Sequence, residues 1–221
     1  MEIMEVRKID FGEIPQKALK ILTKPVNFFK TMPKVGGFLE PVIFVLVVSI
    51  VTGILHCLIN IAGLSYIDRG ILESLGLIIF VPVAMIIASF IGAAIMFVIW
   101  KLLGSQENYE TSYRCVAYLT VLAPIAAILG IIPYGGTVLN ALIGLFFIVT
   151  ASIHVHNIPA KKAWLVFGII FALLAIMQIR AEYKVRNFTP STEEVRKKME
   201  ELNKQYREQL EEAKKQIEKA E

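Results

Sequence analysis

The chain has 221 residues, of which 56% are hydrophobic and 19% charged, and its formal net charge is +4. Soluble domains usually carry about a quarter charged residues, so this composition argues against a soluble globular protein. The sequence also has no basic stripe with interleaved aromatic residues, so it predicts no nucleic-acid partner. Of the 23 Lys and Arg residues, the long middle of the chain holds only Arg69, Lys101, Arg114, Lys161 and Lys162. Charges confined to the two ends predict an integral, multi-pass membrane protein.

The first segment, residues 1–40, contains a stretch with helical spacing, "IPQKALKILTKPVNFF". Its apolar positions fall on one helix face, and lysines flank that face; the apolar positions are Ile14, Ala18, Ile21, Leu22 and Phe29. An amphipathic helix of this kind can lie flat on a membrane with its lysines at the lipid headgroups. It can equally pack its apolar face on the protein's own inner surface, and the pattern alone does not separate these alternatives.

Uncharged runs predict five membrane spans in a membrane domain covering residues 41–181, and these lie near 41–65, 75–101, 116–132, 137–154 and 163–180. About 20 helical residues cross a hydrocarbon core, so the uncharged run 115–160 is too long for one helix. The residues Pro133, Tyr134, Gly135 and Gly136 supply a chain reversal that divides it. The predicted fold is therefore an all-α, five-helix transmembrane bundle with an amphipathic N-terminal helix and a charged C-terminal helix.

The distribution of positive charge predicts the orientation, because short cytoplasmic loops are enriched in Lys and Arg. Most basic residues before the last span fall on the side of the N-terminus, which we therefore place in the cytoplasm. Trp100 and Trp164 are expected to be interface anchors on that side, and the turn at Tyr134 is expected outside. One feature disagrees, since Arg180 directly follows the last span on the outer side, with further basic residues close behind it.

The last segment, residues 182–221, is rich in charge and predicts a helical tail. Its apolar positions follow a nearly heptad spacing; they are Val195, Met199, Leu202, Tyr206, Leu210, Ala213, Ile217 and Ala220. Such spacing is typical of a short coiled coil or of a helix that docks on a partner, so residues 189–221 are a candidate for protein recruitment or homo-oligomerisation. The alternative is a single solvated helix, because alanine weakens the apolar stripe.

Few polar side chains lie within the predicted spans. His56 and Asn60 are four residues apart on one helix face, and Asn140 lies in the fourth span. They form a candidate polar intramembrane cluster that could line a path or bind a ligand, or they make interhelical hydrogen bonds. His154 and His156 point to opposite sides of a helix, and no acidic residue or cysteine near them completes a metal site. The sequence predicts no catalytic residue, no metal and no cofactor.

Four stretches in this order resemble the Yip family, the Rab-interacting-protein-like membrane proteins with five spans; they are "LTKPVNFFKTMP", "LLGSQENYETSYRCVAYLTVLAP", "ILGIIPYGG" and "HVHNIPAKKAW". The likeness covers roughly residues 20–180. It implies a cytosolic N-terminus and a role in trafficking or membrane organisation without enzymatic activity. The acidic, aromatic DLYGP-like motif of the Rab-binding relatives is replaced by Thr23-Lys24-Pro25, and a charged C-terminal helix is added. These departures favour a prokaryotic relative in the plasma membrane.

Two functional hypotheses follow. The first is a non-enzymatic scaffold or adaptor that contacts membrane lipids and recruits a protein partner through its tail. The second is a small-solute or lipid transporter without intramembrane charges, whose path would be lined by the cluster of His56, Asn60 and Asn140. A membrane-embedded hydrolase is disfavoured, since no convergent acid, base and nucleophile are visible in the sequence.

Overall fold

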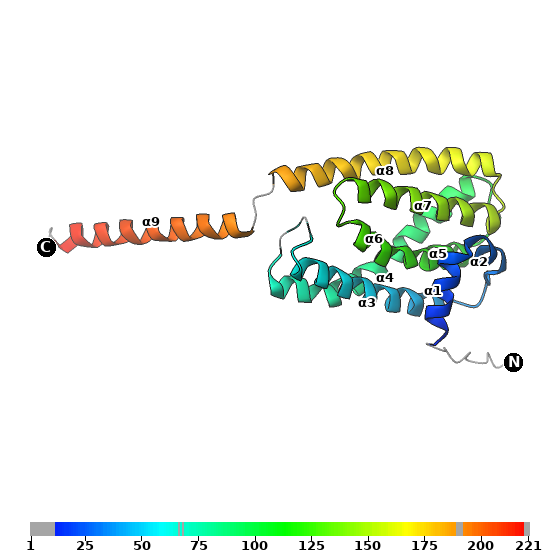
Figure 1. Ribbon diagram of the computed structural model, residues 1–221, viewed down its shortest axis with the longest axis horizontal. Coiled ribbons are helices and arrows are strands. Elements are labelled where there is room, and N and C mark those ends of the chain that lie inside the picture. Colours follow the sequence, from blue (N-terminus) through cyan, green and yellow to red (C-terminus); the bar gives the residue numbers. More distant parts are fainter. Residues whose placement is uncertain (1–11, 66, 68, 189–191, 219–221) are drawn as a thin grey trace.

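The structure is a computed structural model that describes residues 12–65, 67, 69–188 and 192–218. Five helical segments are long and apolar enough to cross a membrane: Leu39–Ile61, Ile71–Leu102, Tyr109–Leu129, Gly135–His154 and Ala160–Asn187. They form one helical bundle, with two short helices across one end of it and a charged helix at the C-terminus (Figure 1). The prediction of an all-α, five-span membrane protein is confirmed.

The first two spans are α3 (Leu39–Ile61) and α4 (Ile71–Leu102), which run antiparallel and share the most extensive helix contact in the bundle. A small residue permits this close packing. A Cβ atom added at Gly53 would lie 2.8 Å from the carbonyl oxygen of Leu77 on α4. In a membrane, helices associate largely through such close van der Waals packing, because lipid offers no hydrophobic driving force between them.

The third span consists of α5 (Tyr109–Leu119), a 3₁₀ turn η1 (Thr120–Leu122) and α6 (Ala123–Leu129). It begins well before residue 116, because the side chain of Asn108 caps the helix by accepting a 2.9 Å hydrogen bond from the Thr111 N–H. Arg114 therefore lies inside this span rather than in the loop before it. The helix therefore extends beyond the uncharged run that predicted this span, because the cap at Asn108 and not the last charged residue sets where the helix begins.

The chain then reverses between Leu129 and Gly135, where α7 (Gly135–His154) begins. Pro133 and Tyr134 lie in this turn, whereas Gly135 and Gly136 already form the start of α7. Tyr134 has a φ of +53°, which is unusual for a residue other than glycine. A Cβ atom at Gly136 would overlap the carbonyl oxygen of Leu129, so only glycine allows the two helices to approach this closely.

The fifth span belongs to α8 (Ala160–Phe188), which packs along α7. Gly144 of α7 faces the ring of Phe171, and an added Cβ atom would come within 2.8 Å of it. The helix α8 continues without a break past residue 180, where the uncharged run ends. We call the end of the bundle that carries α1, α2 and the start of α8 the N-terminal side. We call the opposite end, which carries the Leu129–Gly135 turn and the end of α8, the turn side.

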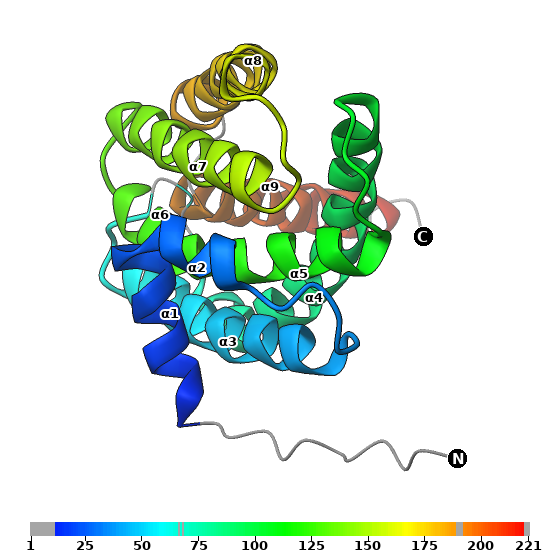
Figure 2. The same ribbon diagram turned by 90° about the vertical axis from the view of Figure 1, so that its right-hand side faces the viewer.

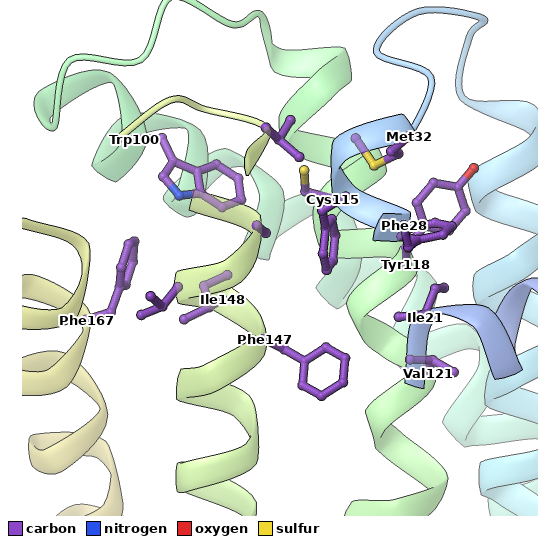
Figure 3. Packing of buried hydrophobic residues seen from close by; sticks show 14 of the residues in the cluster. Ile21, Phe28, Met32, Trp100, Cys115, Tyr118, Val121, Phe147, Ile148 and Phe167 are labelled. Atoms are coloured by element: carbon purple, nitrogen blue, oxygen red, sulfur yellow. The ribbon is translucent and has the colours of Figure 1, made fainter. Parts of the chain in front are cut away.

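The helices α1 (Glu13–Thr23) and α2 (Pro25–Thr31) lie on the N-terminal side (Figure 2). The predicted apolar face of α1 points into the protein, because Ile14 and Ile21 are buried there. Ile21 and Phe28 join the main core close to Tyr118 and Val121 (Figure 3). Of the two alternatives for this amphipathic helix, the structure shows packing on the protein's own surface.

The C-terminal helix α9 (Thr192–Glu218) confirms the predicted charged helical tail and is drawn apart from the bundle in Figure 1. Its apolar stripe is exposed as far as its side chains are described, from Val195 to Leu210. The predicted continuation of this stripe lies outside the described side chains, as do the first eleven residues of the N-terminal segment.

Candidate functional site: a polar cluster on the N-terminal side

Arg114 is the centre of a polar cluster beneath the N-terminal segment. The helix α5 directs this side chain between the start of α3 and the chain that leads into it, where it is only 1% exposed. Its Nε donates a 2.7 Å hydrogen bond to the Pro33 carbonyl, and its Nη1 donates one of 2.9 Å to the Gly37 carbonyl. Its Nη2 lies 2.9 Å from the Glu40 carboxylate. The planar guanidinium thus binds two carbonyls of the segment between α2 and α3 and the Glu40 side chain at the start of α3, as its fixed fork of donors permits.

Glu40 joins Arg114 to α1. The Glu40 carboxylate forms a second ion pair with Lys17, the residue that α1 places over the ring of Tyr118. The Tyr118 hydroxyl donates a 3.2 Å hydrogen bond to Glu40 and accepts one of 3.4 Å from Arg114. We call Lys17, Glu40, Arg114 and Tyr118 the Arg114 cluster. Two cations around one carboxylate, with a shared hydroxyl, hold α1 to the first and third spans.

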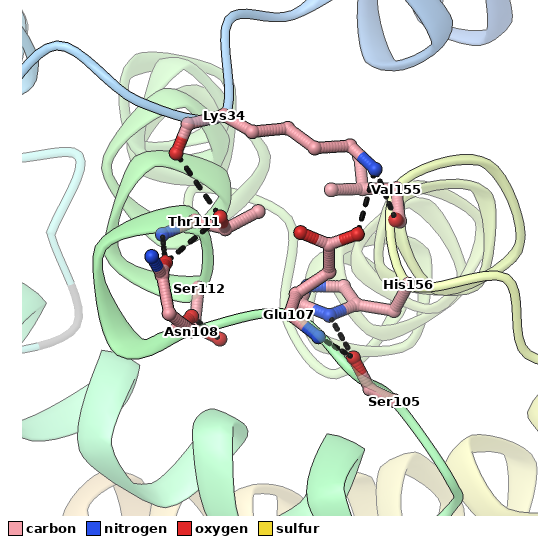
Figure 4. Close-up of polar contacts among 8 residues, drawn as sticks. All are labelled: Lys34, Ser105, Glu107, Asn108, Thr111, Ser112, Val155 and His156. Carbon is pink, nitrogen blue, oxygen red and sulfur yellow. Dashed lines mark hydrogen bonds and ion pairs between the residues drawn. The ribbon is translucent and has the colours of Figure 1, made fainter.

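A second set of contacts closes the same side of the bundle (Figure 4). The Lys34 ammonium forms a 2.7 Å ion pair with Glu107 and donates a 3.3 Å hydrogen bond to the Val155 carbonyl. The Lys34 carbonyl accepts a 3.0 Å hydrogen bond from the Thr111 hydroxyl. Lys34 therefore connects the N-terminal segment to the loop before α5 and to the loop after α7.

His156 lies beneath these contacts and is almost fully buried. Its ring stacks on the Trp100 indole with centroids 3.8 Å apart, and its Nδ1 lies 2.8 Å from the Ser105 hydroxyl. Burial, together with the positive charges of Lys34 and Lys101, lowers the pKa of His156 to about 3. The imidazole is therefore neutral at physiological pH and acts as a flat packing group rather than as a charge.

These arrangements position chain segments and do not resemble a catalytic centre. Both cysteines, Cys57 and Cys115, are buried thiols, which lack the exposure that a nucleophile requires. Within the described ranges, no group of three or more His, Cys, Asp or Glu side chains is placed to hold a metal ion. What the Arg114 cluster can do is keep the N-terminal segment on the bundle in one conformation.

The structure does not bring the three predicted intramembrane polar residues together through hydrogen bonds. The Asn60 amide nitrogen donates a 2.7 Å hydrogen bond to the His56 carbonyl one turn earlier in the same helix. The Asn140 amide nitrogen donates one of 3.2 Å to the Ala126 carbonyl of α6. In the described part of the chain, no hydrogen bond joins Asn140 to His56 or Asn60. The hydrogen bond of Asn140 joins α7 to α6, so it is an interhelical hydrogen bond, the alternative to a polar path or ligand site.

The two predicted interface tryptophans have different environments. Trp164 is 48% exposed at the start of α8, whereas Trp100 has no exposed surface. The Trp100 indole nitrogen donates a 2.8 Å hydrogen bond to the Ser152 hydroxyl. The expected anchoring role of Trp100 is therefore corrected: its ring packs between protein segments on the N-terminal side and does not face lipid headgroups.

The predicted turn carries a polar contact that sequence reasoning missed. Glu182 of α8 is 6% exposed and accepts a 3.1 Å hydrogen bond from the Tyr134 N–H and one of 2.8 Å from the Thr137 hydroxyl. Arg186 lies 2.8 Å from the same carboxylate. In the sequence, Glu40 and Glu182 each lie at the margin of an apolar run. This position is the signal that could have indicated a buried polar contact.

Comparison with known protein families matches residues 19–179 to the Yip1 domain. No curated protein and no solved structure matched the chain. The matched region begins in α1 and ends in α8, so it includes Glu40, Arg114 and Tyr118 of the Arg114 cluster, the first four spans, the turn and most of the fifth span, whereas Lys17 lies just before it. Because the match covers well over half of the chain and its helices form the expected five-span bundle, this protein belongs to the Yip1 domain family of multi-pass membrane proteins.

Proposed function

We propose that this protein is a non-enzymatic adaptor in a prokaryotic plasma membrane, with its N-terminus in the cytoplasm, and that it recruits a protein partner through α9. Yip1 family membership supports this proposal, because the family consists generally of non-enzymatic trafficking proteins. The bundle would serve as the membrane anchor, and the Arg114 cluster would keep its N-terminal surface in one conformation.

The observation that carries the proposal is the exposed apolar stripe of α9. Five side chains at near-heptad spacing are each between 45% and 63% exposed; they are Val195, Met199, Leu202, Tyr206 and Leu210. Charged residues surround the stripe, and Lys204 and Glu208 lie on the opposite face of the helix. A narrow apolar stripe bordered by charges of both signs is suited to pairing with another amphipathic helix.

Site-specific photo-crosslinking in native membranes tests this proposal. A photoreactive residue at Met199 or Tyr206 should capture one defined protein, whereas the same residue at Lys204 or Glu208 should not. Deletion of residues 192–218 should abolish the product while the bundle still inserts into the membrane. Equal products from both faces, or none from either, would overturn the adaptor role. A product with twice the mass of the chain would identify a second copy as the partner.

The transport hypothesis receives no comparable support. The hydrogen bonds of Asn60 and Asn140 go to backbone carbonyls of the bundle itself. None of His56, Asn60 and Asn140 lines the cavity formed by Tyr134 and the end of α8, or the hollow on the surface of α9.

A further inference from the structure

The end of α8 extends beyond the membrane core on the turn side. A helix of 29 residues is about 43 Å long, whereas the hydrocarbon core is about 30 Å thick. The described helix ends at Phe188, so its last turns reach the level of the lipid headgroups beside the turn that contains Tyr134.

One face of this extension is fixed to the turn. Glu182 binds the Tyr134 N–H and the Thr137 hydroxyl, and Arg186 pairs with Glu182 while lying over the Tyr134 ring at 5.7 Å. The position of this part of α8 relative to α7 is therefore set by buried polar contacts. It is not a frayed helix end.

A cavity of about 440 Å³ lies beside this fixed face, and its lining residues are Tyr134, Ile179, Arg180, Tyr183 and Lys184. Ile179 and Tyr183 are one helical turn apart, and so are Arg180 and Lys184 on the adjacent line of the same helix. The surface that lines the cavity is almost entirely apolar, so Arg180 and Lys184 contribute to it mainly through their aliphatic stems.

The two cations have no acidic partner among the described residues, in contrast to Arg186. Both are exposed, and both lie on the side of the bundle where basic residues are otherwise scarce. Positive charge next to an apolar hollow at headgroup depth is complementary to an amphiphile with an anionic head.

We propose that this cavity binds an anionic phospholipid of the leaflet on the turn side. The phosphate group lies between Arg180 and Lys184, and the upper part of an acyl chain lies along Ile179 and the Tyr134 ring. This occupant accounts for the basic residues that follow the last span on the side where such residues are rare.

Native mass spectrometry of the purified full chain in a neutral detergent tests the proposal with phosphatidylglycerol as the probe. The double variant R180Q/K184Q should bind this lipid about tenfold more weakly, since each cation near an anionic headgroup contributes appreciably to binding. The double variant K204Q/R207Q removes the same charge from the exposed surface of α9 and should bind like the unmodified chain. Ile179→Trp, which fills the cavity, should weaken binding with both cations in place.

Three outcomes would overturn the proposal: equal loss in both charge variants, no loss in R180Q/K184Q, or unchanged binding in Ile179→Trp. Inorganic phosphate at millimolar concentration is the competing probe. If phosphate displaces the lipid completely, the site recognises a free anion and the lipid assignment fails. Thermal unfolding of each variant accompanies the binding data, and the single variant R180Q, with an expected smaller loss, replaces any double variant that does not fold.

Discussion

The guanidinium of Arg114, in the third span, lies 2.9 Å from the carboxylate of Glu40 at the start of the first span. The arginine is 1% exposed, whereas the Glu40 side chain is 33% exposed, so the pair lies at the boundary between protein interior and surroundings. It connects two helices that are far apart in the chain and also holds the segment between α2 and α3.

Replacing Arg114 should release that segment. Arg114→Lys cannot reproduce the bonds to Pro33, Gly37 and Glu40 together, because lysine carries a single point charge. A buried acceptor left without its donor costs roughly 1–3 kcal/mol, and we expect a total loss of about 3 kcal/mol, because lysine keeps the positive charge but not the bonds to both carbonyls. Thermal unfolding in detergent should show a clear decrease in the midpoint.

Limited trypsin digestion adds a local measurement for this variant. Cleavage at the exposed Lys30 or Lys34 should become faster in Arg114→Lys than in the unmodified chain. Lys20→Gln, which removes an exposed charge of the same segment, is the matched control and should leave both measurements unchanged. A stable, protease-resistant Arg114→Lys protein would show that the cluster does not hold the segment.

The contact between the first two spans predicts opposite effects for two glycines. In Gly53→Ala, the new methyl group would lie 2.8 Å from the Leu77 carbonyl oxygen, so α3 and α4 must separate, at a cost of about 1–3 kcal/mol. In Gly76→Ala, the methyl group meets no atom within 4 Å, and the better helix propensity of alanine should stabilise α4 by up to about 1 kcal/mol. Unfolding midpoints shifted in the same direction for both variants would contradict the observed packing.

The turn between α6 and α7 permits an equally direct comparison of neighbouring positions. Gly136→Ala should prevent the normal approach of the helices, because the methyl group would overlap the Leu129 carbonyl oxygen. Gly135→Ala should be tolerated, since its methyl group would lie 3.4 Å from the Cγ2 atom of Ile132, which is an ordinary van der Waals distance. The yield of monodisperse protein after detergent extraction measures the difference. Similar yields for the two variants would refute this geometry.

Mild acid should destabilise the protein through His156. Its pKa is about 3 when folded and about 6.5 when unfolded, so the unfolded chain binds the extra proton first as the pH falls. The stability contributed by the neutral imidazole is complete above pH ~6.5 and is lost progressively toward pH ~3. At pH ~5 the loss from this group is about 2 kcal/mol.

Thermal unfolding between pH ~7.5 and pH ~5 measures this effect, because the pKa values of most carboxyl groups lie below that pH range. His156→Phe keeps a flat ring against Trp100 without a titrating group, so its midpoint should fall less with pH than that of the unmodified chain. His154→Phe, at a less buried position of the same segment, should retain most of the decrease. If His156→Phe and the unmodified chain have the same pH dependence, another group is responsible.

Cysteine labelling tests the orientation. The native thiols of Cys57 and Cys115 are buried, so they should give little background with a membrane-impermeant maleimide. In intact cells we expect Gly135→Cys and Lys204→Cys to react, and Lys161→Cys to react only after permeabilisation. Reaction of Lys161→Cys alone in intact cells would place the N-terminus outside. Reaction of Gly135→Cys and Lys161→Cys from the same side would exclude a membrane crossing by α7.

The amino-acid sequence alone determined that this is a five-span helical membrane protein with a chain reversal near Pro133 and a charged helical tail. These features depend on local properties, namely the length of each apolar run and the backbone preferences of proline and glycine. The tertiary structure decided where the apolar face of α1 packs, that Trp100 is enclosed by protein, and that Arg114 and Glu182 belong inside helices. These features depend on partners distant in the chain, because a charge is tolerated in a helix that crosses a membrane only when the fold brings an opposite charge and backbone carbonyls to it. Arg114 finds Pro33 and Glu40, and Glu182 finds the Tyr134 N–H, only after the helices have assembled.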